Sequence, residues 1–242
     1  MRIDGKLCIN CELCIAYCPV NAIYPGPDIM VIDQEKCTEC GTCIRPGIVR
    51  CPTKAFQESP STYEYPRSIR KAFSDPATTH IKTRIPGRGT EEVKTNDVTG
   101  RVKKNQYGVA IEIGRPIVSA SFIDFEKITM ALAKHKITYE DCNPVKTLFL
   151  DESRGTLKPE VKQQRVTSSI IEFVIPCEQL ESIIKTLLDV SNEIDTVFSL
   201  DVIARFNSPM MMPEIECLNR LGIKLRPNNK INLGLGKPLS CE

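Results

Sequence analysis

Two groups of closely spaced cysteines occupy the first 52 residues. The first group reads C-x2-C-x2-C-x3-C-P and comprises Cys8, Cys11, Cys14 and Cys18. The second reads C-x2-C-x2-C-x7-C-P and comprises Cys37, Cys40, Cys43 and Cys51. A tight loop with three cysteines two residues apart can wrap three corners of a [4Fe–4S] cube, because each iron takes one thiolate. The fourth thiolate must then come from elsewhere in the chain.

Zinc and disulfide bonds are the alternatives for these cysteines. Structural zinc usually takes two pairs of ligands, and a third cysteine at the same short spacing is not required. Disulfides need an oxidising compartment, and the opening MRIDGKLCIN lacks the basic and apolar blocks of an export signal. The spacing therefore favours two [4Fe–4S] clusters over either alternative.

Residues 1–57 resemble the bacterial two-cluster ferredoxins. The resemblance lies in the phrases CINCELCIAYCPVNAI and CTECGTCIRPGIVRCPTKAF. In that family the fourth cysteine of each motif ligates the cluster of the other motif. The resemblance therefore implies one cluster on Cys8, Cys11, Cys14 and Cys51, and a second on Cys37, Cys40, Cys43 and Cys18.

The second motif departs from the family's short form. Seven residues separate Cys43 from Cys51, where the short form has three. We expect the extra residues, Arg45-Pro46-Gly47, to form a small bulge over the cluster bound by Cys37. Ligation would survive, while the solvent exposure and potential of that cluster would change.

The overall composition is that of an ordinary protein of one or two domains. The chain has 242 residues and a net charge of +2, which gives no argument for a nucleic-acid partner or a membrane surface. No apolar run approaches the roughly 20 residues of a membrane span. Reduced cysteine ligands without an export signal predict a cytoplasmic protein, and exposed clusters of low potential suggest an anaerobe.

Charge is distributed unevenly along the chain. Residues 1–57 carry six basic and six acidic side chains, whereas residues 58–105 carry ten Lys/Arg against six Asp/Glu. Freely diffusing ferredoxins of this type are usually acidic and use that field to find partners. The neutral balance here leaves two interpretations open: chance variation, or a ferredoxin module fixed beside its redox partner.

Residues 58–105 are expected to form a basic linker or docking segment. A short helix from Pro66 to Phe73 fits its first part, and Asp75-Pro76 would stop that helix. The later part is rich in Gly, Thr, Arg and Lys and shows neither a helical nor a strand period. His80 in this segment could donate a proton in a reduction, or it is an ordinary loop residue.

Four basic residues in this segment could bind an anionic substrate, cofactor or partner. Guanidinium forks and backbone N–H groups near glycines favour carboxylate or phosphate. The alternative is a solvated loop in which nearby acidic side chains pair with these bases. The candidate residues are Arg84, Arg88, Lys94 and Arg101.

Residues 106–242 read as alternating strands and helices. The order strand–helix–strand–strand–helix–strand is that of the split βαβ plait, an architecture that ACT-type modules share. We therefore predict an α+β protein: a two-cluster ferredoxin module (1–57), a linker (58–105) and a plait domain (106–242). The expected strands are 107–114, 147–152, 168–176, 196–206 and 230–238, and the expected helices are 121–136, 177–194 and 212–223, the first capped by Ser119 or Ser121.

The chain beyond the ferredoxin module resembles part of 6-hydroxynicotinate reductase, most strongly over residues 83–116. The resemblance lies in TRIPGRGTEEVKTNDVTGRV and in YGVAIEIGRP, and it implies an iron–sulfur reductase. That family continues into a flavin-associated region, which we expect to be absent here. A flavin would then lie on a partner flavoprotein.

Three functions remain open on the sequence. The preferred hypothesis is an electron-transfer component of an anaerobic reductase related to 6-hydroxynicotinate reductase, an oxidoreductase component rather than a complete enzyme. The first alternative is an ACT-like ligand-binding or regulatory protein whose ferredoxin module reports redox state. The second is a structural iron–sulfur subunit of a larger complex. The sequence determines neither catalytic residues, substrate and electron donor nor oligomeric state.

Overall fold

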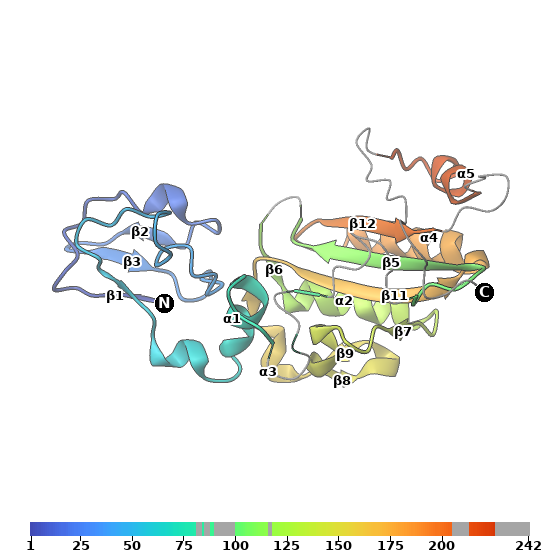
Figure 1. Cartoon of the computed structure of the whole chain (residues 1–242), viewed down its shortest axis with the longest axis horizontal. Coiled ribbons are helices and arrows are strands. Elements are labelled where there is room, and N and C mark those ends of the chain that lie inside the picture. The colour runs from blue at the N-terminus through green and yellow to red at the C-terminus, as the bar shows by residue number, and fades with distance from the viewer. Residues whose placement is uncertain (81–83, 85–87, 90–99, 116–117, 205–212, 226–242) are drawn as a thin grey trace.

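The structure is a computed structural model of the chain, and it describes residues 1–80, 84, 88–89, 100–115, 118–204 and 213–225. Figure 1 shows an N-terminal module at one end, a larger unit of sheet and helices at the other, and helix α1 (Ser68–Ser74) between them. Each end has its own apolar core. The smaller core draws on residues between Met1 and Phe56, and the larger on residues between Ile69 and Ile223.

Two short antiparallel strand pairs build the N-terminal module. Strand β1 (Arg2–Ile3) pairs with β4 (Phe56–Gln57), and β2 (Ile23–Pro25) pairs with β3 (Met30–Ile32). The first pair joins the beginning of the module to its end. It therefore returns the chain near Cys51 to the side of the first cysteine motif.

The short elements of this module were only partly predictable. The sequence predicts short strands near Ile3 and Ile29–Ile32 and short helical turns after Cys14 and Cys43. The two strands are present as β1 and β3. Their partners β2 and β4 were missed, because two or three residues show no period. The helical turn expected after Cys14 is the 3-10 helix η1 (Ile15–Tyr17), whereas the residues after Cys43 form turns without a helix.

A four-stranded antiparallel sheet organises the larger unit. Its strand order is β12-β5-β11-β7, and helices α2 and α4 pack against each other beside it (Figure 1). The helices supply one wall of the core, and the alternate residues of the long strands supply the other. The bounds are β5 Gln106–Ile113, β7 Thr138–Tyr139, β11 Ser169–Pro176, β12 Phe198–Ile203, α2 Phe122–Ala133 and α4 Leu180–Ser191.

The cap of α2 resolves the choice between two serines. The Ser121 side chain accepts a hydrogen bond from the Asp124 N–H and so satisfies one of the free donors at the helix start. Ser119 lies outside the helix with φ of 96°. The prediction of a serine cap is confirmed at Ser121.

The strand expected over residues 147–152 does not join the main sheet. Strand β8 (Phe149–Asp151) pairs instead with β9 (Thr156–Leu157) in a separate two-stranded sheet. The place beside β11 belongs to the two-residue strand β7, with Tyr139 opposite Phe173.

Asn143 explains why the chain leaves the sheet edge before residue 149. Its side chain accepts from the Val145 N–H and caps the 3-10 helix η4 (Pro144–Leu148). Its amide also donates to the Ile170 carbonyl of β11 at 3.0 Å. The buried amide thus fixes a turn that no periodicity in the sequence could indicate.

Smaller elements complete the larger unit. Strand β6 pairs with β10, and short helices fill the connections between the long elements. Their bounds are β6 Ala120–Ser121, η5 Glu152–Arg154, α3 Pro159–Lys162, β10 Arg165–Val166, η6 Cys177–Gln179 and α5 Pro213–Arg220. The expected strand over 230–238 lies outside the described residues, and the assignment of 106–242 to a plait domain stays a prediction.

Helix α1 is packed on both sides, although its segment was expected to be a linker. It follows the 3-10 helix η2 (Pro60–Tyr63), and Asp75 ends it in an extended conformation before Pro76, as predicted. Ile69 and Phe73 belong to the larger core, where the Phe73 ring meets Phe122 edge to face at 5.7 Å. The helix is therefore part of the larger unit's core as well as a connection.

No helix within the described ranges is long and apolar enough to cross a bilayer.

We predict that Gly155→Ala lowers the free energy of unfolding by about 2–4 kcal/mol. Gly155 has φ of 70°, and a Cβ there would lie 2.2 Å from the Thr129 carbonyl oxygen of α2. Gly222→Ala is the matched control. Gly222 has φ of 74°, but a Cβ added there would meet no atom of the described residues within 4 Å, so only backbone strain of about 1 kcal/mol is expected. Denaturant unfolding followed by circular dichroism measures both. Equal losses would contradict the steric argument.

Candidate iron–sulfur centre

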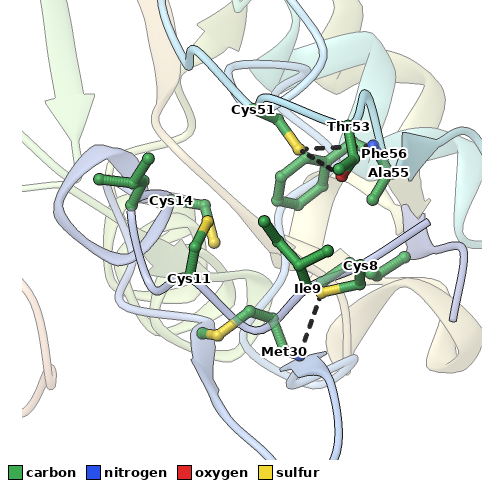
Figure 2. Close-up of a pocket in the computed structure, with 11 residues that line it drawn as sticks. Cys8, Ile9, Cys11, Cys14, Met30, Cys51, Thr53, Ala55 and Phe56 are labelled. Atoms are coloured by element: carbon green, nitrogen blue, oxygen red, sulfur yellow. Dashed lines mark hydrogen bonds between the residues drawn. The ribbon is translucent and has the colours of Figure 1, made fainter.

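The structure brings three cysteines of the first motif together with the last cysteine of the second. Cys8, Cys11, Cys14 and Cys51 line one hollow, and Figure 2 shows them around a common space. The remaining wall is mainly apolar and comes from both ends of the module: Ile3, Ile9, Leu13, Met30, Thr53, Ala55 and Phe56.

A second hollow gathers the other four cysteines. Cys37, Cys40 and Cys43 share it with Cys18 of the first motif. The two hollows enclose about 330 and 360 Å³ of space open to solvent, so they could hold groups of the same size. These are the two sets that the ferredoxin resemblance implies.

Backbone N–H groups point at three of the cysteine sulfurs. Met30 donates to the Sγ of Cys8 at 3.4 Å, as the dashed line in Figure 2 marks. The other two bonds form a repeated pattern: Ala22 donates to Cys18 Sγ at 3.2 Å, and Ala55 to Cys51 Sγ at 3.4 Å. Such bonds favour a negatively charged sulfur, which is the form that binds iron.

The repeated pattern has a sequence signal beyond the cysteine spacing, and our prediction of the ligands did not use it. Cys18 and Cys51 each join the hollow of the other motif, and we call them the crossing cysteines. Each begins a five-residue sequence, CPVNA or CPTKA. The fourth residue, Asn21 or Lys54, has positive φ, and its N–H donates to the cysteine carbonyl. The turn then aims the alanine N–H at the sulfur. Asparagine tolerates this left-handed geometry well, whereas lysine adopts it at a cost that the surrounding turn must offset.

Burial and mutual repulsion raise the pKa of the thiols deepest in each hollow. At Cys14 burial is the main cause, and the thiolates of Cys11, Cys8 and Cys51 add to it. At Cys43 burial, followed by repulsion from Cys37, Cys40 and Cys18, raises the pKa to about 12. Bound iron would supply the positive charge that such crowded thiolates need.

Cys51 is the exception among these ligands. Burial acts to raise its pKa, but the Ala55 N–H and the Thr53 hydroxyl donate to its sulfur and outweigh that effect. The pKa of Cys51 therefore lies below its ordinary value. The turn around Cys51 thus favours the thiolate, the form that would bind iron.

Thr38 provides a separate test of fit. Its side chain lines the second hollow and is 1% exposed, and its hydroxyl finds no partner in the part of the chain that the structure describes. A buried hydroxyl without a partner is unfavourable, and a sulfur atom of a bound cluster would accept a hydrogen bond from it. Together with the two sets of four thiols, this fits a [4Fe–4S] cluster in each hollow.

Among the described residues no three His, Cys, Asp or Glu side chains converge closely enough to hold one metal ion. Each described cysteine is a free thiol.

The two hollows differ in their exposure to solvent. At the first, Cys11 is exposed, and the apolar side chains of Ile9 and Leu13 are 63% and 56% exposed. At the second, Cys37 is buried and Glu39 is 1% exposed. The first hollow therefore has an exposed apolar rim. The second, which we call the enclosed centre, has more buried residues in its lining and lies beside α1, although both hollows open to solvent.

The longer second motif attaches its loop to α1. Its extra residues lie in turns, where the Arg45 guanidinium donates to the Cys40 carbonyl at 3.3 Å and to Asp75 at 2.7 Å. Asp75 ends α1 and also accepts from Lys71. The insertion thereby links the enclosed centre to the helix, while a bulge over the cluster stays a prediction.

The four basic residues expected to bind an anion lie in different settings. Arg88 forms an ion pair with Glu112 of β5 and donates to the Ser168 hydroxyl at 3.0 Å. Arg101 pairs with Glu140 at 3.2 Å. Arg84 is exposed, and Lys94 lies outside the described residues. Two of the four thus contact carboxylates, and the anion or partner site stays a prediction.

His80 packs beside the larger core. Its ring contacts Phe73 edge to face at 6.4 Å, and its Nε2 lies 3.5 Å from the Thr147 hydroxyl. A role for it as a proton donor stays a prediction.

Comparison with known proteins identifies the family of the N-terminal module. Residues 7–55 match the family model described as a 4Fe-4S dicluster domain. Ferredoxin-3 of Chlorobaculum tepidum is 49% identical over 51 residues, which cover 82% of that protein and 20% of this chain. Through this module, the chain belongs to the 4Fe-4S dicluster ferredoxin family. The ferredoxin module accordingly binds iron–sulfur clusters and serves electron transfer.

Two further relatives share the ferredoxin module. Ferredoxin-1 of Rhodobacter capsulatus is 48% identical over 40 residues, which are 62% of its length and 16% of this chain. A component of an ion-translocating oxidoreductase complex from Methanosarcina acetivorans is 44% identical over 50 residues, which are 17% of its length and 21% of this chain. The chain thus spans less than two thirds of either relative, and these matches describe the ferredoxin module alone. No solved structure matches the chain.

We predict that Cys51→Ser disrupts the cluster of the first motif, although Cys51 follows the second motif in sequence. The wild-type protein, purified without oxygen, should hold about eight iron and eight sulfide, and the variant about half as much. Paramagnetic resonance of the reduced variant should retain the signal of the Cys37 cluster. Cys142→Ser, at an exposed thiol outside both hollows, should change nothing. Damage confined to the Cys37 cluster, or stoichiometric zinc, would contradict the crossing.

Proposed function

We propose that this protein is an electron-transfer component of a reductase, which passes single electrons from a protein partner through two [4Fe–4S] clusters. The observation that carries this proposal is the pair of hollows, each lined by four cysteines drawn from both motifs. When bound, each cluster supplies one-electron chemistry. The chain's own residues hold the thiolates and donate N–H groups to sulfur.

The exposed rim of the first hollow supports electron exchange with a partner at that centre. Ile9, Leu13 and Leu7 are 63%, 56% and 42% exposed and surround the loop of the first motif. Exposed apolar side chains beside a redox centre suit a transient docking surface, because they exclude water without requiring matched charges. The module's balance of basic and acidic residues fits such a contact.

The enclosed centre lies on the side of the larger unit and suits the second step of electron transfer. Its loop is bonded to α1 through Arg45, Arg67 and Arg70, and α1 belongs to the core of the larger unit. An electron that enters at the first cluster would thus arrive, at the second, beside the larger unit. The crossing cysteines tie the two centres into one rigid body and so fix the distance between them.

The reductase itself is proposed from two likenesses. Residues 83–116 resemble part of 6-hydroxynicotinate reductase, and the ferredoxin module is shared with a component of an oxidoreductase complex. Reduction of an aromatic ring needs electrons in pairs with protons, whereas each cluster moves one electron. A flavoprotein partner would make that conversion.

We predict that the double variant Ile9→Gln, Leu13→Gln slows electron exchange with reduced flavodoxin by about tenfold, because loss of apolar contact weakens docking by roughly 1 kcal/mol or more. The rate with dithionite, a small donor that needs no docking surface, should stay the same. Leu150→Gln is the control, at a side chain 67% exposed on the larger unit. Iron content and resonance spectra confirm that both clusters are intact. An unchanged flavodoxin rate would contradict docking at this rim.

We predict that the pure, flavin-free protein does not reduce 6-hydroxynicotinate with a chemical donor, and that turnover begins only when a flavoprotein partner is added. The physical reason is the mismatch between single-electron clusters and a two-electron reduction. The measurement is the loss of substrate absorbance under anaerobic conditions. Turnover by the flavin-free protein would show that it is a complete enzyme.

A further inference from the structure

Arg70 is a buried cation on α1 that reaches the loop leading into the second cysteine motif. Its side chain belongs to a residue only 3% exposed. Its Nη1 donates to the backbone carbonyls of Gln34 at 2.8 Å, Glu35 at 3.1 Å and Cys37 at 2.8 Å. Its Nε donates to the Gln164 side-chain oxygen at 2.8 Å, in the larger unit.

Every one of these acceptors is a neutral oxygen. In the described residues Arg70 forms no ion pair, whereas its neighbours on the helix do: Arg67 pairs with Glu39, and Lys71 with Asp75. Burial lowers the pKa of the Arg70 guanidinium, but an arginine remains charged in a protein. A buried charge is strongly unfavourable unless an opposite charge lies nearby.

The carboxylates of Glu35 and Glu39 lie near enough to act on Arg70 electrostatically, and a negatively charged cluster on Cys37 would add to them. Four thiolates make a bound [4Fe–4S] cluster negative, and one-electron reduction makes it more negative. A fixed positive charge bonded to the backbone of a ligand cysteine stabilises the reduced form most, because the attraction grows with the negative charge of the cluster. Net charge and hydrogen bonding around a cluster are established determinants of its potential.

We propose that Arg70 is the built-in counter-charge of the cluster held by Cys37, Cys40, Cys43 and Cys18, and that it raises the reduction potential of this cluster above that of the other. The inference rests on the proposed ligand assignment. It also gives the larger unit a part in electron transfer, because Gln164 orients the guanidinium and the Phe122 N–H of α2 donates to the Gln164 carbonyl at 3.1 Å.

The test is a redox titration of the intact protein with both clusters followed by paramagnetic resonance. Arg70→Gln should reduce the equilibrium constant for reduction of the enclosed cluster about tenfold, a shift of ~59 mV to lower potential for one electron. The exposed cluster should shift less. Arg70→Lys, which keeps the charge, should restore most of the potential. Lys36→Gln is the control, because Lys36 adjoins Cys37 in sequence but its side chain is 62% exposed and screened by water.

A second variant separates charge from structural support. Gln164→Glu keeps the shape and the hydrogen bond to Arg70 but cancels its charge, so it should lower the potential of the enclosed cluster even if Arg70→Gln fails to fold. If Arg70→Gln or Gln164→Glu loads both clusters and leaves the potential unchanged, the counter-charge proposal is wrong while the ligand assignment stands. If the wild-type protein shows no second cluster, both proposals fail.

Discussion

The arrangement on which the rest depends is that each cysteine triplet shares its hollow with a fourth cysteine from the other motif. Cys51 lies beside the first triplet and Cys18 beside the second. This crossing closes the module from β1 to β4 and leaves its apolar core only a small role, which fits strands of two or three residues. Short strands suffice where metal–ligand bonds supply much of the folding free energy.

Bringing four thiols together in each hollow also disfavours their negatively charged, thiolate forms. Thiols packed together and buried bind protons tightly, as the raised pKa of Cys43 shows. Hydrogen-bond donors around the hollows favour the thiolate forms. Backbone N–H groups donate to Cys8, Cys18 and Cys51, and a buried hydroxyl lies at the second hollow. Arginines donate to the carbonyls of Cys37 and Cys40. The arginines come in part from outside the ferredoxin module, so the rest of the chain shares in the site.

Helix α1 carries this connection because its two faces differ. Ile69 and Phe73, four residues apart, enter the larger core, while Arg67 and Arg70, three residues apart, reach the second motif. Ser74 adds a bond on the side of the larger unit by accepting from the Thr167 N–H at 2.9 Å. A seven-residue helix is marginal alone and is stable here because both faces are occupied. Relative movement of the ferredoxin module and the sheet would have to break these bonds.

The sequence by itself determined the features that are local. Cysteine spacing predicted the iron–sulfur class, and period and capping predicted α2, α4 and the long strands to within a few residues, because these depend on neighbours along the chain. The ferredoxin resemblance implied which cysteines share a hollow. Only the tertiary structure decided that residues 149–151 leave the main sheet and that the helix in the supposed linker packs into the larger core. It also decided the partners of the basic residues. Arg88 meets a carboxylate and Arg70 meets none in the described residues, although the sequence shows two similar arginines in one basic segment. The physical reason is that charge pairing and burial act between residues far apart in sequence, on which no local pattern reports.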